Sequence, residues 1–197
     1  MCLFIGCKSN SNSGISLKSD TTAVEINTPP EIQKKLTGQE LLDSFAEEYY
    51  LHYPDNVSFS ETVSTSEDKD PRKFYKLEDF EAALPLYLVQ VKLYPDVPYV
   101  NFYTGMSAYN AGEYNIAIEH FEKAQSKFPD DKYTLSTYFY IGLSYLRIGE
   151  VDKCKLAMNE YLDKGGIMTG RCSMLFQDLR LKWEPEQAKQ DSILSQP

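Results

Sequence analysis

Histidine and cysteine, the residues most often used for metal binding and for nucleophilic or acid–base catalysis, are few and isolated in this chain. The two histidines, His52 and His120, have no Cys, Asp or Glu neighbour at a recognisable ligand spacing, and His120 is predicted to face solvent. Adjacent acidic pairs such as Glu47-Glu48 and Asp130-Asp131 are typical of a solvated surface. We therefore expect no metal site, no cofactor and no enzymatic activity.

Two of the four cysteines, Cys154 and Cys172, fall in the second half of the chain, and no two cysteines form a CxxC pair. A disulfide between these two is an alternative, but two buried thiols are the favoured prediction. The glycine-rich segment from Gly165 to Gly170 lacks the Gly-Lys-Ser/Thr ending of a phosphate loop. We interpret it as a turn between helices.

Cys7 is the one residue whose context predicts a covalent modification. The segment Phe4-Ile5-Gly6-Cys7 resembles the lipobox of bacterial lipoproteins, and this resemblance implies that Cys7 becomes the lipidated first residue of the mature chain. The apolar run before it is shorter than the roughly 7 to 15 residues of a signal peptide, which leads us to expect a start codon assigned too late. The alternative is a frayed N-terminus with an accidental apolar patch.

Lipidation predicts a membrane-anchored lipoprotein at the bacterial cell envelope, in the periplasm or at the outer membrane, with a cytoplasmic protein as the alternative. The lipid would be the only membrane contact, because no apolar run reaches the roughly 18 residues that a membrane span needs. A formal net charge of -9 disfavours nucleic acid as a partner, since phosphates would be repelled. With 42% hydrophobic and 13% aromatic residues, the 197-residue chain can bury a substantial core.

An internal repeat predicts the elements that carry these residues. The most regular copy runs from Gly105 to Pro129, and looser copies begin at Gly142 and at Phe74. The spacing of small and large residues in the central copy resembles the tetratricopeptide repeat (TPR) pattern, in which glycine, tyrosine, alanine, phenylalanine and proline recur at fixed offsets. The matching residues of the central copy are Gly105, Gly112, Tyr114, Ala117, Phe121, Ala124 and Pro129.

This resemblance implies an all-α fold: a TPR-type helix-turn-helix solenoid of about three repeats with flanking capping helices. Gly105 and Gly142 are expected to let the two helices of a repeat approach closely. Gly112 and Gly149 are expected to end the first helix of their repeats in a left-handed conformation. Phe121 should then fill the space between repeats.

Helical periodicity predicts one further helix on each side of the repeats. Thr37-Gly38-Gln39-Glu40 has the pattern of a capping box and begins an amphipathic run that ends at Pro54, while a closing helix is predicted from Cys172 to Trp183. Residues 58–70 are predicted to form a loop, which leaves the first repeat a short first helix, and Pro85 is expected to kink the second. The predicted organisation is a lipobox-like segment over residues 1–7, a flexible linker over 8–37, a helical domain over 38–183 and a disordered tail over 184–197.

The first helices of the repeats are expected to line a groove that binds a protein or peptide. The resemblance assigns this role to mostly aromatic and aliphatic residues, a composition that suits an apolar peptide, an amphipathic helix or a segment of the protein's own chain. Any single aromatic among them could equally belong to the core between helices. The predicted groove residues are Tyr75, Tyr99, Phe102, Met106, Tyr109, Asn110, Phe139, Leu143, Leu146 and Arg147.

The prediction is therefore a non-enzymatic scaffold or adaptor that mediates protein–protein interaction at the bacterial cell envelope. A rigid stack of helices would present its binding surface without a large ordering cost on contact. Two alternatives remain open: a structural or regulatory subunit of an envelope assembly complex, and a glycan-binding surface lipoprotein whose aromatic residues stack on sugars.

Overall fold

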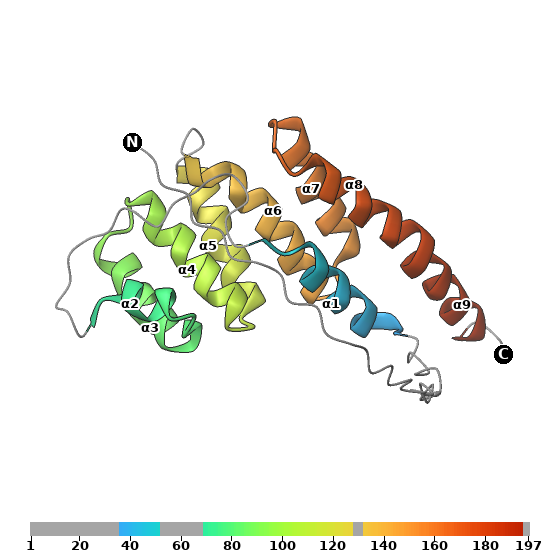
Figure 1. Cartoon of the computed structure of the whole chain (residues 1–197), viewed down its shortest axis with the longest axis horizontal. Helices are drawn as coiled ribbons and strands as arrows, with labels where there is room; N and C mark the ends of the chain where they lie inside the picture. Colours follow the sequence, from blue (N-terminus) through green and yellow to red (C-terminus); the bar gives the residue numbers. More distant parts are fainter. Residues whose placement is uncertain (1–35, 52–68, 128–131, 195–197) are drawn as a thin grey trace, which may run out of the picture. The chain divides into compact units, whose positions relative to one another are not determined.

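The computed structural model describes residues 36–51, 69–127 and 132–194, and the regular elements in these ranges are helical (Figure 1). Short turns join most neighbouring helices, so that they run antiparallel. No helix in these ranges is both long and apolar enough to cross a bilayer. In chain order the elements are α1 (Gly38–Tyr49), α2 (Pro71–Lys76), α3 (Phe80–Leu93), α4 (Pro98–Asn110), α5 (Tyr114–Lys127), α6 (Lys132–Arg147), α7 (Val151–Asp163), α8 (Thr169–Asp178), the π-helical turn η2 (Leu179–Trp183) and α9 (Glu184–Leu194).

The helices from α2 to α7 form successive pairs: α2 with α3, α4 with α5, and α6 with α7. Each pair packs against the next through contacts of α3 with α4 and of α5 with α6. Figure 1 shows α4, α5, α6 and α7 following one another across the stack. The first helices α4 and α6 also touch, as expected when repeats stack into a solenoid. This arrangement confirms the predicted all-α, TPR-like solenoid.

Glycines set the spacing of the helices in the second and third pairs. An added Cβ on Gly105 would lie 2.5 Å from the Phe121 ring, and one on Gly142 would lie 2.8 Å from a side chain of α7. Carbon atoms do not pack this closely, so these helix pairs can approach only at glycine. Gly112 and Gly149, with φ of 81° and 80°, follow α4 and α6 in the left-handed region. Both predicted glycine roles are confirmed.

The first pair is short, as predicted, because α2 spans only 6 residues. Its N-terminus is capped by Asp70, which accepts a hydrogen bond from the Arg72 N–H at 3.0 Å. Asp79 caps α3 in the same way by accepting a hydrogen bond from the Ala82 N–H at 3.2 Å. Pro85 lies on the exposed side of α3, and the helix continues past it.

Helix α1 packs against α6, α8 and η2. Thr37 makes no side-chain cap bond, so the predicted capping box does not form. Gln39 instead donates from its side-chain amide to the main-chain oxygens of Leu146 at 2.9 Å and Arg147 at 3.1 Å, the last carbonyls of α6. A tertiary contact has replaced the local cap. The apolar face that α1 buries consists of Leu42, Phe45, Ala46 and Tyr49.

The C-terminal segment differs from the predicted disordered tail. The chain continues from α8 through η2 into α9, so residues 184–194 are helical and the prediction is wrong for them. Pro185 accounts for the π-helical turn, because its ring would clash with the carbonyl one turn earlier in a regular α-helix. The Glu184 N–H donates to the Leu179 oxygen in the widened turn. An ion pair of 2.7 Å between Lys155 and Glu184 ties this segment to α7.

The predicted buried thiols are confirmed, since Cys154 on α7 and Cys172 on α8 are both free and buried. The Cys172 thiol lies 3.7 Å from the sulfur of Met158. Burial raises the pKa of Cys172 to about 11 and also raises that of Cys154, so both stay protonated near neutral pH. Gly165, with φ of 85°, forms the predicted turn between the two helices.

Candidate functional site

Most of the predicted groove residues lie in the core of the stack. Eight of the ten belong to α2, α4 or α6 and are no more than 8% exposed. A partner cannot contact them on this surface, so the prediction that they line an open groove is wrong. These eight are Tyr75, Tyr99, Phe102, Met106, Tyr109, Phe139, Leu143 and Leu146.

Aromatic packing between repeats accounts for this burial. Tyr75 of α2 packs edge-on against Tyr103 of α4 with ring centroids 5.2 Å apart, and Phe102 lies 5.1 Å from Tyr133 of α6. Rings of this size fill the space between successive first helices, where smaller side chains would leave a groove open. The aromatic content that suggested a binding surface is instead part of the core.

The chain itself covers another part of the predicted groove. The ring of Tyr50, directly after α1, stacks on Tyr109 of α4 with centroids 5.4 Å apart and planes 3° apart. The hydroxyl of Tyr140 on α6 donates a hydrogen bond to the main-chain oxygen of Leu51. The segment at the end of α1 is therefore an intramolecular occupant of this surface.

A small polar pocket remains where α1 meets the ends of α4 and α6. Here the Arg147 guanidinium lies 3.4 Å from Glu47 and 5.7 Å from the centre of the Tyr114 ring. Its Nε finds no hydrogen-bond partner in the described part of the chain. The cavity measures about 190 Å³ and also contacts Tyr109 and Asn110. It brings together Asn110 and Arg147, the two predicted groove residues outside the buried set, with the buried Tyr109.

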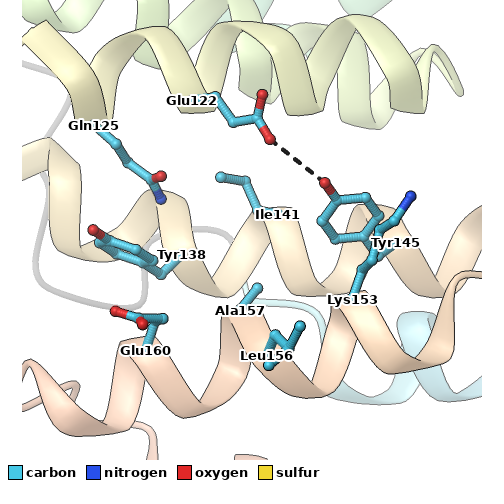
Figure 2. A pocket seen from close by; sticks show the side chains of 9 residues that line it. All are labelled: Glu122, Gln125, Tyr138, Ile141, Tyr145, Lys153, Leu156, Ala157 and Glu160. Carbon is cyan, nitrogen blue, oxygen red and sulfur yellow. Dashed lines mark hydrogen bonds between the residues drawn. The ribbon is translucent and has the colours of Figure 1, made fainter.

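A more apolar pocket, which we call the Leu156 pocket, opens between α5, α6 and α7 (Figure 2). Its floor is formed by Ile141 and Ala157, and the rings of Tyr138 and Tyr145 flank this floor. The two tyrosines are two helical turns apart on α6, a rise of about 10 Å. The cavity measures about 220 Å³. Leu156 is 66% exposed, so an apolar side chain faces solvent at the mouth of the pocket.

Polar groups surround the floor of the Leu156 pocket. The Tyr145 hydroxyl donates to Glu122 at 3.4 Å, and the Lys153 ammonium lies 5.5 Å from the centre of the same ring. Burial and the Glu122 carboxylate raise the pKa of Tyr145, which keeps its hydroxyl neutral. The amide of Gln125 points toward the pocket, and its buried Nε2 has no hydrogen-bond partner within the described ranges. This arrangement can accept an apolar side chain together with one carbonyl oxygen.

The second histidine has a structural role. His120 is 4% exposed, contrary to the prediction that it faces solvent, and its Nδ1 lies 3.2 Å from the Asn101 side-chain oxygen. Asn101 donates in turn to the Pro95 main-chain oxygen at 3.4 Å. Burial lowers the pKa of His120 to about 4, so the neutral ring joins α5 to α4. No cluster of His, Cys, Asp and Glu in the described ranges could hold a metal ion.

The Leu156 pocket is absent from the sequence predictions, although its signal is present in the chain. Tyr138, Ile141 and Tyr145 recur at i, i+3 and i+7, and Leu156 interrupts the polar face of α7. Such spacing predicts a packed helix face, and it does not reveal that α5 and α7 leave part of that face uncovered. The pocket depends on the separation of two helices, which is a tertiary property.

Comparison with known proteins agrees with this architecture. Residues 99–131, which include α5 and all of α4 but its first residue, match the family model described as Tetratricopeptide repeat. A search of curated proteins finds no match to the chain. The matched repeat and the stacked helix pairs together support a TPR protein, and repeats of this kind serve as scaffolds for protein–protein interaction.

Proposed function

We propose that the protein is a non-enzymatic scaffold that binds a protein partner at the bacterial cell envelope through the Leu156 pocket. The pocket is the observation that carries this proposal, because it leaves an apolar floor open on the same repeats whose predicted groove is filled by core side chains and by α1. Apolar surface bounded by polar groups is typical of protein contact sites. Recognition by a preformed pocket also avoids a large ordering cost.

The chemistry of the pocket indicates the kind of segment that it would bind. Because two tyrosine rings flank an aliphatic floor, a leucine, methionine or phenylalanine side chain would contact apolar surface on several sides. The Gln125 Nε2 would donate to a main-chain oxygen of the segment, which would satisfy a buried donor that is otherwise unpaired. We therefore expect the partner to insert one large apolar side chain next to an accessible carbonyl.

The test is crosslinking in the native host, followed by identification of the crosslinked proteins for wild type and two variants. Leu156→Glu places a charge over the apolar floor, whereas Met174→Glu places the same charge at a comparably exposed position on α8 (66% and 54% exposed). We expect one protein to be captured by wild type and by Met174→Glu but not by Leu156→Glu. Its affinity, measured with purified proteins, should fall at least roughly tenfold in Leu156→Glu. Equal capture by all three chains would contradict the assignment.

The envelope location is proposed from Cys7, which lies outside the described residues. We expect the product of the native gene to incorporate labelled palmitate in its host and to lose this label in Cys7→Ala. Cys2→Ala is the matched control, because a lipobox cleaved before Cys7 would remove Cys2 from the mature protein. Label that persists in Cys7→Ala, or that is absent from all chains, would rule out the lipid anchor.

A structural subunit of an envelope assembly is the second candidate, and the burial of the predicted groove favours it. Phe102 and Phe139 hold the helices together and offer no surface to a peptide. The same burial takes the predicted groove aromatics away from the surface, so the glycan-binding alternative would depend on other aromatic residues. If the protein is a structural subunit of this kind, Leu156→Glu should capture the same crosslinked proteins as wild type.

A further inference from the structure

Helix α3 is apolar around nearly its whole circumference. Glu81, Gln90 and Lys92 are its only charged or amide side chains. One side, which includes Tyr87, is buried in the stack, but Val89 and Leu93 on another side are 53% and 64% exposed. A helix that is apolar all round normally belongs to a protein interior. The exposed side of α3 is therefore a surface that another element would be expected to cover.

The position of α3 in the stack makes this exposure more significant. It is the second helix of the first pair, at the N-terminal end of the stack formed by α2 to α7, and it packs against α2 and α4. Solenoids require a polar outer face on their terminal elements to remain soluble. The helix that precedes this pair in the sequence, α1, packs against α6 and α8, far along the chain. Among the described residues, the first pair of the stack thus retains an apolar surface in place of a polar cap.

Charges of opposite sign lie at the two ends of this surface. Glu81 is in the first turn of α3 and Lys92 is in its last turn. They are eleven residues apart, close to three full turns, so both lie on the same flank of the helix. Both are exposed, and neither forms an ion pair with another described residue. The surface therefore carries one unpaired acid and one unpaired base with apolar side chains between them.

We propose that this surface of α3 binds a second copy of the chain, with the two α3 helices packed antiparallel about a two-fold axis. In this arrangement each Glu81 meets Lys92 of the second copy, because a two-fold axis brings the same flank of both helices together at opposite ends. Pro85 and Val89 of one copy lie across from Val89 and Pro85 of the other. The contact buries the exposed apolar side chains and forms two equivalent ion pairs.

The distribution of charge favours a second copy over other occupants. An isologous dimer requires a surface that is complementary to itself under a two-fold rotation. An acid at one end and a base at the other, with an apolar stripe between them, meets this requirement when the helices are antiparallel. The proposal is independent of the Leu156 pocket, which is formed by α5, α6 and α7.

Sedimentation equilibrium of the full chain over a range of concentrations tests this proposal. We expect wild type to have twice the mass of one chain, and Val89→Glu to have the mass of one chain. Leu156→Glu is the matched control, since it places the same charge on an exposed apolar residue of α7 and should leave the dimer unchanged. Circular dichroism should show that both variants keep the helical content of wild type. A wild type that is monomeric at every concentration, or a Val89→Glu dimer, would overturn the proposal.

Exchange of the two charges tests the antiparallel arrangement. Glu81→Lys and Lys92→Glu each place like charges together at both ends, so each should raise the dimer dissociation constant by about tenfold. The double variant restores opposite charges with their signs exchanged, and its dissociation constant should return to within about threefold of wild type. A double variant whose dissociation constant is raised by the product of the two single effects would contradict the antiparallel pairing. In a parallel pair, or on a different dimer surface, neither single variant would weaken the dimer, and that outcome would also overturn the antiparallel pairing.

Discussion

The Tyr49 hydroxyl donates a hydrogen bond of 2.6 Å to the Asp178 carboxylate, and this contact joins α1 to the end of α8 across 129 residues of sequence. Burial and Asp178 both raise the pKa of Tyr49, so the hydroxyl remains a donor at all physiological pH values. Tyr49→Phe should lower the free energy of unfolding by about 1.5 to 3 kcal/mol, because it leaves part of a partly buried carboxylate unpaired. Urea denaturation measures this loss.

The matched control for Tyr49→Phe is Tyr145→Phe. The Tyr145 hydroxyl also donates to a carboxylate, that of Glu122, but the bond is longer at 3.4 Å and lies at the surface. Its removal should cost less than about 1 kcal/mol. Equal losses in the two variants would show that the contact between α1 and α8 contributes no more than a surface pair.

The close approach of α4 and α5 at Gly105 leads to a second prediction. Gly105→Ala should destabilise the protein by about 1 to 3 kcal/mol, because the new methyl group would lie 2.5 Å from the buried Phe121 ring and force the helices apart. Gly170→Ala on α8 is the control, since its methyl group would meet no atom within 4 Å. It should be neutral, or stabilising by up to about 1 kcal/mol from helix propensity. Thermal or urea unfolding of both variants distinguishes strain from propensity.

Truncation of Phe121 should have a larger effect than either glycine substitution. The ring is fully buried and stacks on Tyr140 of the next repeat with centroids 5.6 Å apart. Phe121→Ala should therefore cost about 3 to 5 kcal/mol through lost burial and a residual cavity. A loss below about 1 kcal/mol in urea denaturation would show that the two repeats are not held together through this ring.

The buried His120 predicts a dependence of stability on pH. Its pKa is lowered from 6.5 to about 4 in the folded chain by burial, so the unfolded chain binds the proton more readily between these values. The stabilisation is complete above pH 6.5, falls as the pH decreases and is lost below about pH 4. The full difference amounts to about 3 kcal/mol.

Two measurements check the titration of His120. In a His52→Gln background the chain has a single histidine, and the NMR shifts of its ring should titrate near pH 4 in the folded protein. The decrease in unfolding free energy between pH 6.5 and 4.5 should also be smaller in His120→Gln than in wild type. A ring that titrates near 6.5, with no difference between the two stability profiles, would show that His120 is solvated.

Features governed by nearby residues were predictable from the sequence. The glycines at 105, 112, 142 and 149 each act within one helix pair, and the turn at Gly165 joins adjacent helices. Their roles follow from spacing within a repeat, where the geometry repeats as well. Short-range regularity therefore identifies the solenoid and the pairing of its helices.

Features that depend on distant residues were not predictable. Gln39 lies within a capping-box pattern, but its side chain donates a hydrogen bond to the end of α6. Tyr50 stacks on Tyr109 only because α1 is placed beside α4 and α6 in the fold. A phenylalanine such as Phe102 or Phe139 is as compatible with a groove as with a core. Only its burial in the folded stack shows that it belongs to the core. The Leu156 pocket depends similarly on the distance between α5 and α7.

The docking of α1 has a consequence for synthesis of the chain on the ribosome. The hydrogen bond from Gln39 to the Leu146 oxygen spans 107 residues, so α1 is translated well before the helix that buries it. At about 5 to 20 residues per second, this interval is roughly 5 to 20 seconds. The pairs α2–α3 and α4–α5 can form during this time through local contacts, while the apolar face of α1 stays open to chaperones. Closure of this long loop is therefore expected to be a late step in folding, completed only after α6 has been synthesised.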